Sequence, residues 1–142
     1  MKNFPSNILI EIGKKTQNIN PILFYGNESG LIIELIKSIY SSLQKKLDLS
    51  EIIYFDYKNN NDDELEEILK SSSLFSKINF IVIKNPQERL VKQLENIDKQ
   101  VNILLINGEN LRTNSKLKLY FENHQKFIGV PCYKLQTKDI KN

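Results

Sequence analysis

A loop between an apolar run and a helical pattern is the first place in this sequence where chemistry could occur. The loop consists of Gly26, Asn27, Glu28, Ser29 and Gly30. A phosphate-binding loop of the form GxxxxGK[ST] cradles phosphates with backbone N–H groups, its lysine reaches the β- and γ-phosphates, and its hydroxyl holds Mg²⁺. Here only three residues separate the two glycines, and Leu31 and Ile32 stand where the lysine and the hydroxyl residue belong. We therefore expect no nucleotide hydrolysis, no metal and no cofactor, although N–H groups at a helix start could bind an anion weakly.

Three other side chains could carry chemistry, and each has a simpler interpretation. Asp56 ends a predicted strand, but a lone acid there is more often a loop cap than a metal ligand. His124 is the only histidine and lies in the polar stretch ENHQK, which favours a surface position at a helix end. Cys132 is the only cysteine, and a thiol in a strand usually packs as a small apolar side chain. One cysteine and one histidine cannot complete a zinc site.

Leu74 and Phe75 follow a run of three serines that ends at Ser73. The preceding helical pattern has its apolar arc within residues 65–69, and the next position that would face the core is itself a serine. If the helix continued, Leu74 would point away from that arc and Phe75 would lie on its flank. From spacing alone, the pair either folds over one end of the sheet and completes the core, or forms an exposed apolar wedge that binds a partner.

The elements that position these residues alternate between strands and helices. Apolar runs predict strands at residues 21–25, 51–56, 78–83 and 101–106 and within 126–135, where Pro131 indicates an edge or a strand end. Helices are predicted at residues 29–47, 61–70, 87–97 and 114–124, the second with a capping box formed by Asn61 and Glu64. Short apolar strands that alternate with helices predict an α/β fold, with a five-stranded parallel sheet and helices on both faces, in a single domain spanning residues 1–142.

The composition is that of an ordinary globular protein, with 40% hydrophobic and 26% charged residues. No stretch has the length of a signal peptide or a membrane span, and a single cysteine favours a reducing compartment. We therefore expect a cytoplasmic protein with no membrane partner. The net charge of +3 is too small to argue for nucleic-acid binding, and we interpret the acidic stretch at residues 51–70 and the basic residues after residue 100 as solvated faces.

Three stretches give the sequence a resemblance to the N-terminal domain of the delta subunit of bacterial DNA polymerase III, which belongs to the clamp loader. ILFYGNESGLIIELI, residues 22–36, resembles the family's strand–glycine–acidic–helix opening, which stands where its ATPase relatives have a P-loop. SSSLFSKINFIVIKNP, residues 71–86, is similar to its Leu-Phe segment before a strand. ILLINGENLRTNSKLKLYF, residues 103–121, resembles the stretch that follows the family's fourth strand. In order and spacing these stretches cover about residues 20–123.

The resemblance implies an AAA+ domain, which has a P-loop-NTPase-like fold, with a degenerate nucleotide site and no ATPase activity. It implies that Leu74 and Phe75, with Ser73 beside them, bind the ring-shaped sliding clamp (the beta subunit) and open one of its interfaces during DNA replication. The chain would then act within the DNA polymerase III holoenzyme and contact DNA only indirectly. Family members continue into a helical lid and a collar that contacts the other clamp-loader subunits, and we expect both to be absent from this chain.

Two other functions stay open on the residues alone. A nucleotide-binding enzyme with a divergent phosphate loop would turn over ATP. A DNA-binding domain that used the basic C-terminal third would bind DNA with steeply salt-dependent affinity.

Overall fold

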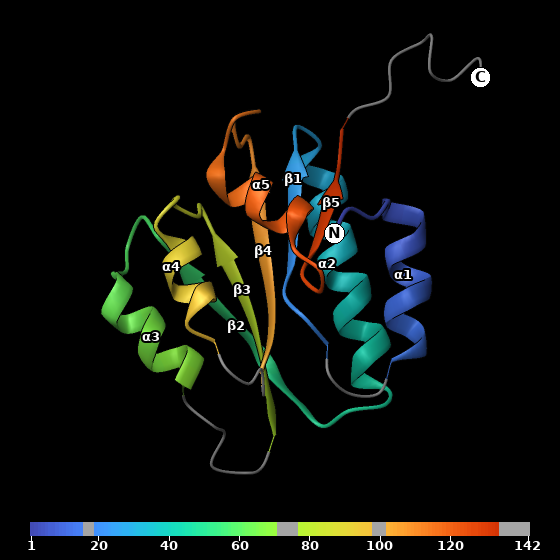
Figure 1. Ribbon diagram of the computed structural model, residues 1–142. Helices are drawn as coiled ribbons and strands as arrows, with labels where there is room; N and C mark the ends of the chain where they lie inside the picture. The colour runs from blue at the N-terminus through green and yellow to red at the C-terminus, as the bar shows by residue number, and fades with distance from the viewer. Residues whose placement is uncertain (16–18, 71–76, 98–101, 134–142) are drawn as a thin grey trace, which may run out of the picture.

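The computed structural model describes residues 1–15, 19–70, 77–97 and 102–133. Within them a five-stranded parallel sheet has the strand order β2-β3-β4-β1-β5 (Figure 1). The strands are β1 (Ile22–Gly26), β2 (Leu49–Asp56), β3 (Ile78–Lys84), β4 (Ile103–Glu109) and β5 (Ile128–Pro131). The predicted five-stranded parallel sheet is therefore confirmed, and β5, with its proline, lies at an edge as predicted.

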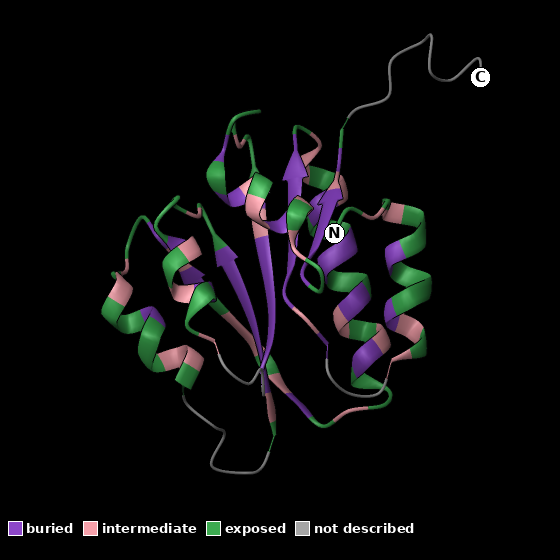
Figure 2. Cartoon of the chain, in the orientation of Figure 1, coloured by how far each residue is buried: buried purple, intermediate pink, exposed green. Residues whose placement is uncertain are grey.

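Helices cover both faces of the sheet, which confirms the predicted layers (Figures 1 and 2). The helices are α1 (Pro5–Lys14), α2 (Ser29–Gln44), α3 (Asp62–Lys70), α4 (Leu90–Glu95) and α5 (Lys116–Asn123). One core cluster joins α1 and α2 to strand residues such as Phe24 and Val82. The other joins α3, α4 and α5 to the alternate strand residues, such as Leu23 and Ile83. Because successive side chains of a strand point to opposite faces, the runs of consecutive apolar residues in the central strands fill two cores.

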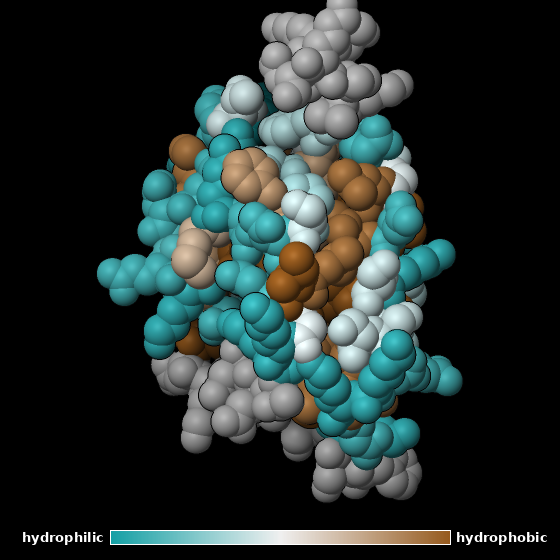
Figure 3. All heavy atoms as spheres, turned by 90° about the vertical axis from the view of Figure 1, so that its right-hand side faces the viewer, coloured by the Kyte–Doolittle hydropathy of each residue, from teal (hydrophilic) through white to brown (hydrophobic). Residues whose placement is uncertain are grey.

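Helix α1 is the element that the sequence patterns did not predict. Proline occupies its first turn, where the missing N–H costs no hydrogen bond, and Ile8 and Ile12 are buried one turn apart against α2. The adjacent apolar side chains of Leu9 and Ile10 are exposed, and this obscures the helical periodicity. Figure 3, which faces this side of the molecule, shows apolar side chains among hydrophilic ones. Ahead of the helix, Lys2 forms a parallel bridge with Gly129 and so extends the sheet beyond β5.

Element boundaries differ from the predictions where tertiary contacts decide them. Strand β4 continues to Glu109, three residues past its predicted end, because Asn107 to Glu109 pair with the end of β1. Helix α4 is shorter than the predicted 87–97 and buries Leu90 and Leu94, the pair that suggested it. The predicted cap of α3 is present, since the Glu64 N–H donates a 3.0 Å hydrogen bond to the Asn61 side chain. No helix in the described part of the chain is long and apolar enough to cross a membrane.

The packing of α1 leads to a stability prediction with an internal control. Ile12 is 1% exposed, so Ile12→Ala should lower the free energy of unfolding by about 2–5 kcal/mol. Ile10 is 59% exposed on the same helix, so Ile10→Ala should change it by less than about 0.5 kcal/mol. Urea denaturation of the two variants measures both values. Equal effects would show that α1 does not attach to α2 through its Ile8–Ile12 face.

Candidate functional site

The carboxyl end of β1 lies at the place where ligands bind in open parallel sheets. The chain leaves β1 toward α2 on one face, and it leaves the neighbouring strand β4 toward α5 on the other face. Adjacent strands with connections on opposite faces leave a crevice outside their carboxyl ends. The five residues of the predicted degenerate phosphate loop, from Gly26 to Gly30, form this connection and the start of α2.

The backbone of Gly26 is held against the end of β5. Gly26 has a φ of +131°, and a Cβ atom there would lie 2.1 Å from the carbonyl oxygen of Cys132. The Cys132 N–H donates to the Tyr25 carbonyl at 2.6 Å, and the Glu28 N–H donates to the Cys132 carbonyl at 3.1 Å. The glycine is therefore required by the close approach of two backbones, and one loop N–H that could have faced an anion is bonded within the protein.

The side chains after the loop are placed for packing. Ile32 is fully buried in the core beside α1, and Leu31 is half-buried against the same cluster. Glu28 is the N-cap residue of α2, and its side chain accepts no capping hydrogen bond. A carboxylate at this position would repel a phosphate at the helix start. The two positions after Gly30 thus carry neither the lysine nor the hydroxyl residue with which a P-loop binds Mg-ATP.

Asp56, the acid at the end of β2, serves as a loop cap. Its Oδ1 accepts hydrogen bonds of 2.9 Å from the Lys58 N–H and from the Asn85 side chain. Asn85 follows β3 with a φ of 50°, a left-handed conformation that asparagine tolerates better than most residues. The hydrogen bond from Asn85, followed by the one from the Lys58 N–H, lowers the pKa of Asp56. The interpretation of Asp56 as a cap is confirmed.

His124 and Cys132 also have the structural roles expected of them. His124 follows α5, and its Nδ1 accepts 3.0 Å hydrogen bonds from the backbone N–H groups of Lys126 and Phe127. Burial lowers the pKa of His124, which keeps the ring neutral as these bonds require. Cys132 is fully buried, and burial raises the pKa of its thiol to about 12. In the described part of the chain, no three acidic, histidine or cysteine side chains come together as a metal site.

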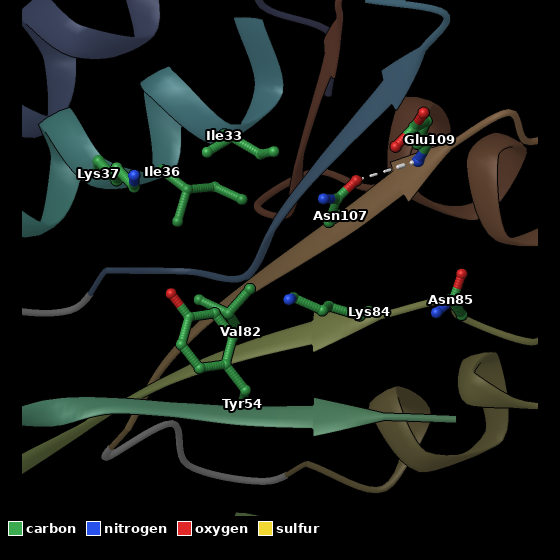
Figure 4. A pocket seen from close by; sticks show the side chains of 9 residues that line it. All are labelled: Ile33, Ile36, Lys37, Tyr54, Val82, Lys84, Asn85, Asn107 and Glu109. Atoms are coloured by element: carbon green, nitrogen blue, oxygen red, sulfur yellow. Dashed lines mark hydrogen bonds between the residues drawn. The ribbon is translucent and has the colours of Figure 1, made fainter. Parts of the chain in front are cut away.

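A pocket of about 420 Å³ lies beside the loop, between α2 and the carboxyl ends of β2, β3 and β4 (Figure 4). Ile33, Ile36 and Lys37 of α2 line one side of it. Side chains of the three strand ends, among them Tyr54 and Lys84, line the other. Sequence analysis missed this pocket. The available signal was the pair of lysines, Lys37 on the helix and Lys84 after an apolar strand, but nothing in their spacing indicates that the fold brings them to one cavity.

The predicted clamp-binding residues Ser73, Leu74 and Phe75 lie outside the described residues. They belong to the connection between α3, which ends at Lys70, and β3, which begins at Ile78. The apolar arc of α3 is as predicted, with one leucine buried and the other two apolar side chains half-buried, at positions 65, 68 and 69. The assignment of a wedge to Leu74 and Phe75 therefore stays a prediction.

Strand order, helix layers and the strand–loop–helix at β1 define an α/β domain of the P-loop NTPase type whose loop lacks the phosphate-binding side chains. A family model described as "DNA polymerase III, delta subunit" matches residues 22–130, and the chain belongs to that family.

Among solved structures, the chain is similar to the "Bacillus subtilis DNA clamp loader delta protein (YqeN)", with a TM-score of 0.67 and 14% sequence identity. The similarity covers 94% of this chain and 44% of that one, so the chain spans less than half the length of that protein. At this identity the match shows a shared fold. No curated protein matches the chain.

The two loop glycines give a prediction about which of them the backbone geometry of the loop requires. Gly26→Ala should destabilise the fold by about 1–3 kcal/mol or more, because the new Cβ would clash with Cys132 and strain a left-handed residue. Gly30→Ala should leave stability unchanged or raise it by up to about 1 kcal/mol, because Gly30 lies in the first turn of α2 and a Cβ there would make only an ordinary 3.8 Å contact with the Glu28 side chain. Thermal unfolding of the two variants measures the difference. A tolerated Gly26→Ala would contradict the close approach.

Asp56 gives a prediction about pH. A carboxyl group whose pKa is lowered by folding stabilises the protein above its unfolded pKa, and this stabilisation is lost as pH falls through the lower folded pKa. The stability difference between the wild type and Asp56→Asn should therefore be constant near neutral pH and shrink below pH 3.8, the ordinary value for this carboxyl. Urea denaturation of both proteins between pH 2 and pH 7 measures this stability difference. In an Asn85→Gly background the same difference should be smaller at neutral pH, because the largest cause of the shift is gone.

Proposed function

We propose that this chain is the N-terminal domain of a clamp-loader delta subunit, which binds the DNA polymerase sliding clamp and opens its ring during DNA replication. The observation that carries the proposal is the family match, which runs from the start of β1 almost to the end of β5 and includes the Leu74–Phe75 segment. The match to the clamp loader delta structure supports the same fold over nearly the whole chain.

Leu74 and Phe75 are the proposed contact with the clamp, with Ser73 beside them. A fully buried leucine or phenylalanine contributes about 1.5–3 kcal/mol, so two such side chains in a partner's pocket can anchor a small interface. Binding of this kind opens the ring only if the domain has higher affinity for the clamp state whose interface is open. The work of opening is therefore limited by the difference between the two affinities.

The domain is proposed to act without hydrolysing ATP. Ile32, at the place of the Mg²⁺-binding hydroxyl, is buried in the core, and Glu28 puts a negative charge at the start of α2. Partner subunits that bind ATP would supply the regulation. We propose that this domain meets them through the lid and collar regions found in longer family members, and that it contacts DNA only indirectly.

The clamp contact is tested with a double variant at the two proposed contact residues. Leu74→Ala/Phe75→Ala should weaken binding to the beta clamp by roughly tenfold to a hundredfold for each side chain, since a tenfold change corresponds to about 1.4 kcal/mol. Ile10→Ala removes an exposed apolar side chain on the opposite face of the sheet from α3, and it should bind the clamp as the wild type does. Surface plasmon resonance with immobilised clamp measures all three proteins. Unchanged affinity for the clamp in a folded double variant would contradict the proposed contact through Leu74 and Phe75.

The same protein preparations distinguish the two alternative functions. Saturable ATP turnover by the purified chain would favour a divergent nucleotide-binding enzyme. DNA affinity that falls steeply with salt would favour a DNA-binding domain, because phosphate contacts release counterions. The proposed function predicts neither ATP turnover nor salt-dependent DNA binding by this chain.

A further inference from the structure

The pocket beside α2 is separate from the degenerate loop. None of its lining residues belongs to the segment from Gly26 to Gly30. It lies over the carboxyl ends of β3 and β4 and reaches the edge strand β2 (Figure 4). Its volume of about 420 Å³ falls within the range of roughly 300–1,000 Å³ that is common for small-molecule sites.

Four of the residues that line the pocket are aliphatic or aromatic, and they form its floor and two of its sides. Ile36 and Val82 are buried beneath it, at the base of the gap between helix and sheet. Ile33 and Tyr54 stand on opposite sides and are 47% and 53% exposed. A flat apolar group placed between them would remove both from water, and burial of apolar surface is the main favourable term in binding of this kind.

The polar groups at the rim are mostly hydrogen-bond donors and cations. The Lys84 ammonium lies 4.7 Å from the centre of the Tyr54 ring, within the cavity wall. Neither Lys84 nor Lys37 forms an ion pair with any described residue. Figure 4 shows the Asn107 amide nitrogen turned toward the space beside Ile33, while its oxygen accepts the Glu109 N–H at 3.2 Å.

Glu109 is the one acidic residue that lines the pocket, and it comes from the end of β4. Two lysines against one glutamate leave a net positive rim. A ligand that fits this arrangement has an apolar body for the space between Ile33 and Tyr54 and an anionic group for the lysines.

We propose that this pocket binds one small aromatic anion, a flat ring system that carries a carboxylate, sulfonate or phosphate group. The ring lies between Ile33 and Tyr54, and the anionic group pairs with Lys84 and Lys37 and accepts from Asn107. The proposal does not depend on clamp binding, because the pocket residues come from α2, β2, β3 and β4 and exclude the Leu74–Phe75 segment.

The test uses 8-anilinonaphthalene-1-sulfonate and its uncharged analogue N-phenyl-1-naphthylamine, which has the same rings without the sulfonate. Fluorescence titration of the full chain should give one saturable site for the sulfonate and at least tenfold weaker binding of the uncharged analogue, because the lysines distinguish the two. Lys84→Gln should weaken sulfonate binding by about tenfold, and Lys37→Gln should weaken it by a smaller factor. Lys46→Gln removes the same charge from the exposed turn that follows α2 and should bind as the wild type does.

Amide chemical shifts place the bound dye. In ¹H–¹⁵N spectra of the labelled chain, the largest shifts should fall on residues 33–37, 54, 82–85 and 107–109. The proposal is overturned if both dyes bind equally well, if Lys84→Gln and Lys46→Gln bind alike, or if the shifts cluster elsewhere on the chain. Clamp binding by the same variants should be unchanged, which keeps this test separate from that of the proposed function.

Discussion

The close approach of the Gly26 and Cys132 backbones determines the form of the carboxyl end of the sheet. Three strands meet there, because β1 ends at Gly26, β5 continues into Cys132, and Asn110 after β4 donates to the Gly26 carbonyl at 2.9 Å. The left-handed conformation of Gly26 lets these backbones approach without a side chain between them. The start of α2 is thus bonded to β5 through Glu28, and the loop has a fixed path that does not depend on a bound phosphate.

The unequal covering of the two faces explains where an open site remains. On one face α3, α4 and α5 form a continuous cluster with the strands. On the other face α1 and α2 pack mainly over β5, β1 and β4, since α1 packs against α2 and not against the far strands. The carboxyl ends of β2 and β3 are therefore less covered there, and Tyr54 of the edge strand stays exposed. The pocket is a consequence of having two helices on a face that is five strands wide.

Much of this fold could be predicted from the sequence, because the central strands are short apolar runs and each strand ends at a polar or glycine-rich segment. The cap at Asn61 and the edge or strand-end position of Pro131 are local properties of residue type and spacing, and they were predicted correctly. Helix α1 was not predicted, because ten residues with two buried positions carry too weak a period. The extension of β4 was missed because its last residues are ordered by pairing with β1 and not by their own apolar character.

The candidate site also has some features that the sequence predicts and others that it does not. The absence of the P-loop lysine and hydroxyl residue after Gly30 can be read from the sequence alone. The role of the Cys132 carbonyl could not be predicted from the sequence, because a backbone group has no signature in residue type. The pocket could not be predicted either, because its two lysines lie 47 positions apart in the chain and are brought together only by the strand order.

The distribution of charge at this end of the sheet follows from these placements. A phosphate-binding lysine would belong at the start of α2, but Leu31 is there and Glu28 makes the helix start negative. The cations lie instead at the end of β3, two strands away from β1, and on the third turn of α2. The end of β1 thus carries an acidic side chain, whereas the end of β3 carries Lys84 beside Asp56 of β2. The first loop thus carries an acidic side chain and is not directly followed by a lysine, while a cavity lined by two lysines lies where that loop does not reach.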